Sequence, residues 1–538
     1  MPLEQNAIDH LAAALRFRRM EEGITLLEDM ADDLEQVGIA MPNPGSLMVL
    51  LAQWIDAGFR DARFLARLMD RFSSAFRKEM PTDQYLQLRL AEGFCALATR
   101  QSDDAIRILG SVIQAREDLG DADKLALAHF WKGRSHRKKG EYESALTHIA
   151  RARDLATASG DFTFRAIICI QESWLLFQKG LGKEALQLLA SSEDALETTD
   201  HYVALGNIES ARGRIIRRSG DYALALRHFA KAERMYEKRD SRHANLARCL
   251  VNAAYVRRIL ALQIRRRIDN RAQSGLRRGP AAPRGGRGEN ESLRARYQRL
   301  CQEAVKNLRT ARKIYEFHGD EDGLGNVVLN LGYLHLDRSE LEMASQEVDT
   351  AFRIGSQRSD QILMARARIL GAACENAHVE EQTGEQEDVA VHASRARQYS
   401  EEALALARST QNRRLLAAAL LARGATAAND FYQDWEMART CATDASGNIG
   451  PGESDMLVEA LADLKARIVQ AAGINDTLRA WSEGMVGDKT FQKVAEEFAE
   501  IVIPKVWLRE GKKIARVAKR LSISPKKVRR ILRHAGLS

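Results

Sequence analysis

The stretch LALAHFWKGRSHRKKGEYESALTHIARA, residues 125–152, holds two apolar patterns of helical spacing that are separated at Gly140. The second pattern contains a small residue, Ala145, followed four positions later by a large one, Ile149. The first contains Gly133, twelve positions before that alanine. Residues as small as glycine let two helices approach closely, and a large side chain can fill the space beside them. The stretch therefore predicts a helical hairpin.

The same three kinds of residue recur at intervals of forty. The alanines are Ala105, Ala145, Ala185 and Ala225, the large residues Leu109, Ile149, Leu189 and Phe229, and the earlier small residues Gly93, Gly133, Ser173 and Gly213. The pattern resumes after an insertion at 265–296 and after a shorter one near 378–391. A fixed period of this length indicates a solenoid, in which each unit buries its apolar face by stacking on the next. We predict an all-α α-solenoid of about forty residues per repeat over residues 86–472, preceded by an N-terminal helical cap at 1–85.

These repeats resemble the tetratricopeptide repeat (TPR), in a version with longer helices. The clearest copies run from Leu125 to Ala152 and from Val203 to Ala232, with Gly-Glu-Tyr and Gly-Asp-Tyr at the hairpin. The resemblance implies that the first helix of each pair lines a concave groove that binds a protein or peptide.

Cations occupy the groove positions that this resemblance implies, which lie one, four and five residues after each marker residue. They are Arg134, Arg137, Lys138, Arg214, Arg217, Arg218, Arg257 and Arg258. Such a strip favours an acidic or phosphorylated peptide as partner, through charge-assisted hydrogen bonds. The alternative is a set of solvated cations that the helix dipole favours near helix C-termini.

The sequence ends in EGKKIARVAKRLSISPKKVRRILRHAGLS, residues 510–538, which contains two short amphipathic helical patterns. Ser524 provides an N-cap oxygen for the second helix, and Pro525 stands at its first position. Val528, Ile531 and Leu532 recur at helical spacing and should face the first helix. From residue 505 to the end, twelve Lys and Arg residues stand against a single acid. A charge so one-sided favours binding to phosphates.

This ending resembles the C-terminal DNA-binding segment of the Fis type. The resemblance is carried without a gap by A-x2-LSIS-x3-V-x3-L-x3-GL, from Ala518 to Leu537, and extends upstream to a helix at about 491–509. Two residues depart from the family pattern, because Ser522 replaces the usual turn glycine and Pro504 interrupts the upstream helix.

The Fis-type resemblance implies a helix-turn-helix domain over residues 491–538 that binds duplex DNA as a homodimer. By analogy with such proteins, Lys526, Lys527 and Arg530 would reach base edges, with Ser524 at the start of the same helix. Phosphate contacts would come from Arg516, Lys519, Arg529 and Arg533.

The insertion at 265–296 has a foreign composition, with ten arginines against three acids and several glycines and prolines. We expect a disordered loop, because such a composition lacks the apolar residues of a core. It would be either a solvated, tolerated loop or an arginine-glycine tract that contacts nucleic acid. A linker at 473–490 is expected to join the solenoid to the C-terminal domain.

Composition excludes several classes of protein. Six cysteines without a CxxC pair predict free thiols in a reducing compartment, and we expect a cytoplasmic protein without a secretion signal or membrane span. The sequence contains neither a phosphate-binding glycine loop nor an HExxH pair. We therefore expect no enzyme, no cofactor and no metal site.

The sequence as a whole predicts a transcription regulator. A TPR solenoid would bind a protein or acidic peptide, and a C-terminal helix-turn-helix would bind duplex DNA. The alternative is an interaction scaffold whose basic tail is a non-specific electrostatic tether to nucleic acid or acidic proteins.

Overall fold

The computed structural model describes residues 5–35, 43–60, 62–99, 101–116, 121–278, 287–381, 386–450, 453–471, 481, 489–534 and 537. These residues form helices and turns with no strand among them, which confirms the predicted all-α fold class. The chain divides into two compact units, Met1–Leu461 and Ala462–Ser538.

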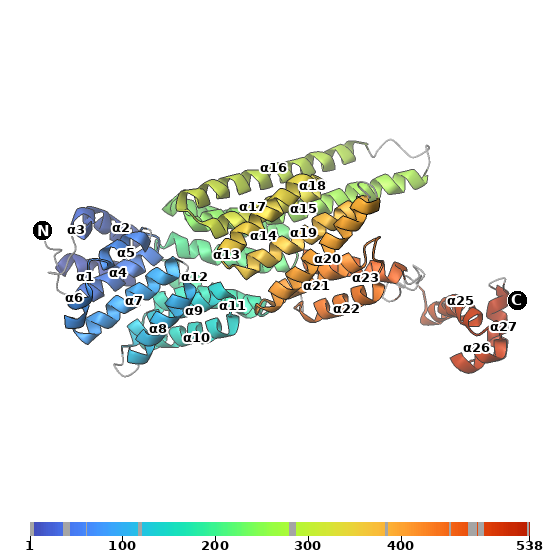
Figure 1. Cartoon of the computed structure of the whole chain (residues 1–538), viewed down its shortest axis with the longest axis horizontal. Coiled ribbons are helices and arrows are strands. Elements are labelled where there is room, and N and C mark those ends of the chain that lie inside the picture. Colours follow the sequence, from blue (N-terminus) through green and yellow to red (C-terminus); the bar gives the residue numbers. More distant parts are fainter. Residues whose placement is uncertain are drawn as a thin grey trace. The chain divides into compact units, whose positions relative to one another are not determined.

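The described part of the first unit contains eight successive helical hairpins (Figure 1). Their helices are α7 (Thr82–Ala98) with α8 (Ser102–Arg116), α9 (Ala122–Lys139) with α10 (Tyr142–Ala158), α11 (Phe162–Gln178) with α12 (Gly182–Leu196), α13 (Tyr202–Arg218) with α14 (Tyr222–Arg239), α15 (Ala244–Arg278) with α16 (Arg287–His318), α17 (Glu321–Asp337) with α18 (Leu341–Gln357), α19 (Gln361–Glu381) with α20 (Gln386–Arg408), and α21 (Arg413–Ala427) with α22 (Trp435–Gly447). The array is the predicted solenoid of helical hairpins.

The repeating small residues lie where the two helices of a hairpin meet. A Cβ atom added at Gly133 would stand 2.8 Å from Cγ1 of Ile149, and one added at Gly213 would stand 2.8 Å from Cε1 of Phe229. Ala145, in the same hairpin as Gly133 and Ile149, is completely buried. Because real Cβ contacts are longer than this, the close approach of the paired helices depends on glycine at these positions.

We predict that Gly213→Ala destabilises the first unit by about 1–3 kcal/mol, because its methyl group would overpack against the Phe229 ring. Helix propensity alone predicts the opposite sign, since alanine is favoured over glycine by about 1 kcal/mol inside a helix. Urea unfolding measures the difference. Gly447→Ala is the matched control, because a Cβ there meets nothing within 4 Å. A stabilised Gly213→Ala variant would contradict the packing argument.

Where the structure describes the chain before the array, it contains six short helices: α1 (Gln5–Arg16), α2 (Met20–Asp29), α3 (Ala31–Glu35), α4 (Pro44–Asp56), α5 (Ala62–Met69) and α6 (Ser74–Glu79). They also reach later hairpins. Thr163 Oγ1, at the start of α11, donates to the Arg16 carbonyl at 2.7 Å. Asp200, just before α13, accepts from the Glu21 amide at 2.8 Å at the start of α2. The N-terminal helices therefore lie along one edge of the first hairpins.

The array winds far enough for early and late hairpins to meet. The Glu143 amide at the start of α10 donates to Gln411 Oε1 at 3.0 Å, and Gly140 lies beside Ile362. Ser454, which follows α22, donates its amide to the Arg218 carbonyl at 2.8 Å. The superhelix therefore surrounds an inner face that α9, α11, α13 and α15 help to line.

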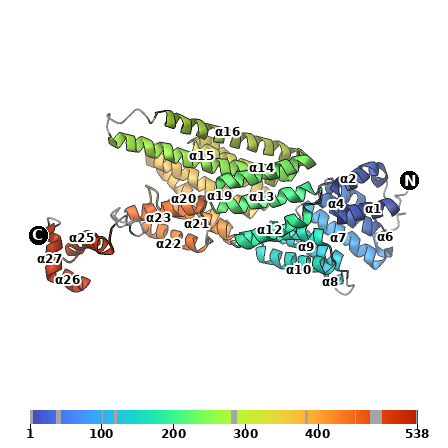
Figure 2. The ribbon, with the colours of Figure 1, turned by 180° about the vertical axis from the view of Figure 1, so that it is seen from behind.

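The expectation of a disordered loop at 265–296 is wrong at both ends. Helix α15 continues to Arg278 and α16 begins at Arg287, and the two run side by side beyond the neighbouring hairpins (Figures 1 and 2). Ile264 and Leu300 are buried between them, with Ile268 and Tyr297 packed against the same cluster. Arginine is itself a good helix former, so a basic composition does not prevent a helix where such apolar residues recur. The middle, 279–286, lies outside the described residues.

In its described residues the second unit contains three helices beyond α23 (Met456–Ala471), which spans the boundary: α25 (Phe491–Arg509), α26 (Ile514–Leu521) and α27 (Pro525–His534). Their shared core is formed by Ile503, Val517, Ala518, Val528, Ile531 and Leu532. Val528, Ile531 and Leu532 therefore face inward, as predicted. Pro504 lies inside α25, which continues through it. Most of the linker expected at 473–490, and Gly536 near the end, lie outside the described residues.

The turn between α26 and α27 has the geometry of a short corner. Ser522 ends α26 with φ at 51°, a left-handed conformation in which glycine is usual. Ser524 Oγ accepts from the Lys527 amide at 3.2 Å, so this side chain caps α27 as expected.

Candidate partner groove and cationic C-terminal surface

Arginines from three first helices form a cationic strip on the inner face. We call this the inner strip: Arg134 and Arg137 of α9, Arg214 and Arg217 of α13, and Arg248 of α15. Burial, and then the charge of Arg248, lower the pKa of Arg137 and of Arg214 to about 9. Arg217 is a further neighbour that lowers the pKa of Arg214. These mutual effects show that the cations lie within electrostatic reach of one another.

Acids are scarce along the inner strip. Arg134 forms an ion pair with Asp56, with 2.6 Å between its Nη1 and the carboxylate. Arg214 and Arg217 instead donate to neutral oxygen atoms, the Ser210 carbonyl at 3.4 Å and Asn252 Oδ1 at 3.3 Å. A partner that supplies carboxylates would therefore find several incompletely balanced guanidinium groups.

Aromatic rings lie beside several of these guanidinium groups. Arg137 lies 5.0 Å from the Trp174 ring centroid, and Arg217 lies 4.7 Å from that of Tyr255. A guanidinium over a ring is held by a cation–π contact while its N–H groups stay available to another ligand. These rings thus orient the inner strip without neutralising it.

The other cations predicted for the groove are held by neighbouring helices. Lys138 donates to the Leu97 carbonyl of α7 at 2.6 Å. Arg257 pairs with Glu303 of α16 at 2.9 Å, and the buried Arg258 pairs with Asp337 of α17. The fourth, Arg218, is buried at the end of α13. Contacts with neighbouring helices thus account for these four side chains.

Arg248 is not predicted by the forty-residue pattern, because the inward face of α15 is displaced from it. The pattern places Ala254 inward, yet that residue is buried, and Asn252 and Tyr255 reach Arg217 instead. Arg248 lies one helical turn before Asn252 and therefore on the same face of α15. The small residues that mark the repeat do not show that the inward-facing positions of α15 lie two residues earlier, at Asn252 instead of Ala254.

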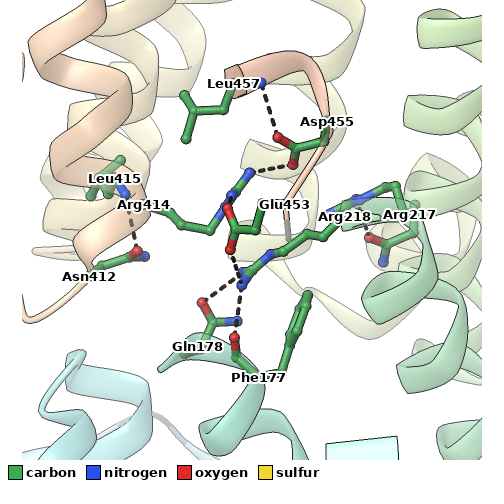
Figure 3. Close-up of polar contacts among 11 residues, drawn as sticks. Phe177, Gln178, Arg217, Arg218, Asn412, Arg414, Leu415, Glu453, Asp455 and Leu457 are labelled. Atoms are coloured by element: carbon green, nitrogen blue, oxygen red, sulfur yellow. Dashed lines mark hydrogen bonds and ion pairs between the residues drawn. The ribbon is translucent and has the colours of Figure 1, made fainter. Parts of the chain in front are cut away.

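Figure 3 shows how Arg218 and Arg414 hold an acidic segment between the early and late hairpins. Arg414 of α21 pairs with both Glu453 and Asp455, and Arg218 lies 3.6 Å from Glu453. Arg218 also donates to the Phe177 carbonyl at 2.8 Å. We call residues 453–455 the acidic latch, because these contacts fasten the end of the array to α13.

Of the eight exposed cations on α26 and α27, seven form no ion pair within the described part of the chain. They are Arg516, Lys519, Lys526, Lys527, Arg529, Arg530 and Arg533, and all are exposed, as is Ser524. Among the described residues, none of the seven forms an ion pair, whereas Arg520 pairs with Glu510. The apolar side chains of the same two helices face the core, so the cationic surface is open to solvent.

We expect the folded protein to lose stability in weak acid because of four histidines whose pKa is lowered. Burial is the main cause that lowers the pKa of His129 and His243 to about 4, and of His148 and His201 to about 3. Unfolding restores a pKa near 6.5, so stability is full above that pH and falls as pH decreases toward these folded values. We expect a loss of about 1 kcal/mol per histidine for each pH unit below 6.5, measured by urea unfolding.

Substitution checks the origin of this pH dependence. His201→Asn should reduce the loss between pH 6.5 and 5.5, whereas the same change at the exposed His10 should leave it unaltered. An equal loss in both variants would assign the effect to other groups.

Comparison with known proteins supports the fold. No family model matches the chain, and no curated protein matches its sequence. The structure is similar to that of a Rap protein complexed with competence and sporulation factor, at 11% identity and a TM-score of 0.52, covering 79% of this chain and 100% of that one. The chain has the fold of a TPR-like helical solenoid. The apo quorum sensor NprR from B. thuringiensis also matches, at 13% identity and a TM-score of 0.49, over 74% of this chain and 98% of that one.

The next features concern membrane-spanning helices, metal sites and cysteines. Within the residues that the structure describes, no helix is both long enough and apolar enough to cross a bilayer. The described His, Cys, Asp and Glu side chains form no group of three that could hold a metal ion. All six cysteines are free, and five of them are buried.

Proposed function

We propose that this chain is a DNA-binding transcription regulator whose TPR-like solenoid binds an acidic protein or peptide. The observation that carries the proposal is the separation of faces on α26 and α27, where apolar residues form the core and seven cations remain exposed and unpaired among the described residues. Exposed cations on a compact helical pair fit the phosphates of a duplex.

In the proposed complex, α27 lies in the major groove. Lys526, Lys527 and Arg530 would reach base edges, and Arg516, Lys519, Arg529 and Arg533 would contact phosphates. Two copies are needed to read half-sites one helical turn apart, so we propose a homodimer on DNA. This role is one of binding and regulation, without catalysis.

The inner strip is the proposed groove for the partner. It offers guanidinium groups on a face that the superhelix surrounds, and acidic side chains would complete their hydrogen bonds. The Rap protein of similar fold is complexed with competence and sporulation factor. That likeness agrees with a partner bound by the solenoid, and the arginines specify an acidic one.

The alternative function is an interaction scaffold whose basic tail attaches to nucleic acid without reading its sequence. Selection of bound duplexes from a random pool by the full chain, at rising salt, separates the two. A regulator should enrich one sequence that survives at salt where the pool is lost, because phosphate contacts carry no sequence information. Uniform loss of every sequence would support the tether.

A further inference from the structure

A small cavity lies at the end of the inner strip, where α9, α11, α13 and α15 meet the N-terminal helices. Its volume is about 170 Å³, which suits a small chemical group and not a folded partner. Asp56 is the single acid in its described lining. The basic residues there are four arginines and two histidines: Arg18, Arg134, Arg137, Arg248, His201 and His243. Asp56 is already engaged, because Arg134 and the Trp131 indole nitrogen both donate to it.

Arg18 is the most unusual residue of this lining. It stands in the turn between α1 and α2 with φ at 54°, and only 7% of it is exposed. Its Nε is buried without a hydrogen-bond partner, and its guanidinium carbon lies 5.8 Å from the Phe164 ring centroid. Burial lowers its pKa, while Asp161 and Asp56 act on it in the opposite direction.

Two further lining groups also have unused hydrogen-bonding capacity. Arg137 Nε is buried without a partner, and its guanidinium lies over the Trp174 ring. His201, 5% exposed, has an unpartnered Nδ1. Buried polar groups are normally hydrogen-bonded, so several unsatisfied groups around one cavity indicate a missing ligand.

We propose that this cavity binds a carboxylate or phosphate group, with Arg18, Arg137 and Arg248 as its receptors. The planar fork of each guanidinium donates two parallel hydrogen bonds to such an oxyanion. Arg248 is exposed and bonds only to Asn245 at 2.7 Å, so it stands at the open side of the cavity. The oxyanion would balance charges that repel one another when the cavity is empty.

Two sources could supply this oxyanion. It could be a free small molecule, or it could be a carboxylate of the acidic partner of the inner strip, and the second source rests on the function proposed above. Binding of a free oxyanion would stand even if no peptide bound.

Calorimetric titration of the full chain, in chloride buffer of constant ionic strength, distinguishes the sources. The probes are inorganic phosphate, glutarate, and an acidic hexapeptide of alternating glycine and glutamate with either a free or an amidated C-terminus. Saturable binding of phosphate or glutarate supports a site for free oxyanions. Binding of the hexapeptide alone supports a partner carboxylate, and preference for the free form identifies it as the terminal one. Absence of saturable binding by all four probes would overturn the proposal.

Two substitutions test the assigned residues. Arg18→Gln and Arg137→Gln should each weaken binding of the effective probe about tenfold or more, the loss of one charge-assisted contact. Arg151→Gln on the exposed face of α10 is the matched control and should bind normally.

The same variants provide a readout that does not depend on the probe. Each cavity variant should unfold at a higher urea concentration than the wild type when no probe is present, because a buried unpaired charge has been removed. Unchanged binding together with reduced stability would show that these arginines are structural and would overturn the assignment. Because the two residues lie on different elements, failure of one variant to fold leaves the other as the test.

Discussion

Replacing Arg529, Arg530 and Arg533 together by glutamine should weaken duplex binding by about two orders of magnitude at physiological salt. All three side chains are exposed, and none forms an ion pair among the described residues, so the change removes charge without breaking an internal contact. Each lost phosphate contact should also lower the slope of log K against log salt by about 0.9. Fluorescence anisotropy with one labelled duplex, measured over a salt series, gives both quantities.

The matched control for this triple variant lies on α14. Arg227, Lys231 and Arg234 are exposed there without an ion pair in the described structure, so replacing them by glutamine removes the same charge from the solenoid. The control should bind DNA nearly as the wild type does. An equal loss in both triple variants would show that net charge alone attracts DNA, which contradicts a specific role for α27.

Separating base contacts from phosphate contacts needs one residue at a time. If Arg530 reaches a base edge, Arg530→Ala should relax sequence preference at one position by about 1–3 kcal/mol. Arg529→Ala should instead weaken every sequence alike. The two arginines are neighbours on the same exposed helix, so a shared loss of folding does not explain a difference between them.

The repeat architecture could be predicted from sequence because its signal is local. Gly133 and Ile149 meet within one hairpin, and the same holds for Gly213 and Phe229, so each contact leaves a fixed spacing in the chain. The inward orientation of Val528 could also be predicted from sequence, because the apolar residues at helical spacing and the capping Ser524 lie within a few residues of each other.

The partner groove was harder to predict, because the availability of a cation depends on residues far away in sequence. Arg258 and Arg217 both follow marker residues, yet Arg258 is neutralised by Asp337, seventy-nine residues away, and Arg217 is not. Arg18 belongs to no repeat, and only the fold brings it to the cavity. Sequence spacing thus located the strip but could not identify which of its arginines are unpaired.

Composition alone gives the wrong structure for the basic insertion. Arginine, glycine and proline give this segment the average composition of a disordered one. The apolar residues that join α15 and α16 are spread along both flanks. Ile264 and Leu300 are thirty-six residues apart, so a reading of either flank alone does not show that they pack together. Pairing of two helices supplies the burial that each flank lacks by itself.

Replacing Arg414 by alanine should release the acidic latch at a cost of about 3–5 kcal/mol. Glu453 and Asp455 both pair with Arg414, and their side chains are only 10% and 4% exposed. Without the arginine, two carboxylates would remain buried with too few partners, and that is much less favourable than losing an exposed ion pair.

Amide hydrogen exchange reports on this latch directly. The Ser454 amide donates to the Arg218 carbonyl and the Leu457 amide donates to Asp455 Oδ1 at 3.1 Å, so both amides should be protected in the wild type. In Arg414→Ala their exchange should accelerate by about a hundredfold or more. The neighbouring Arg413→Ala is the control, because Arg413 is exposed and bonds only to the Gly447 carbonyl.

A triple variant separates the charge from the packing of the latch. If buried carboxylates cause the loss, Arg414→Met combined with Glu453→Gln and Asp455→Asn should recover much of the protection that Arg414→Met alone removes. Failure to recover would mean that the arginine acts through the packing of its side chain. Unchanged exchange in every variant would show that these ion pairs do not hold residues 453–455 against α13 and α21.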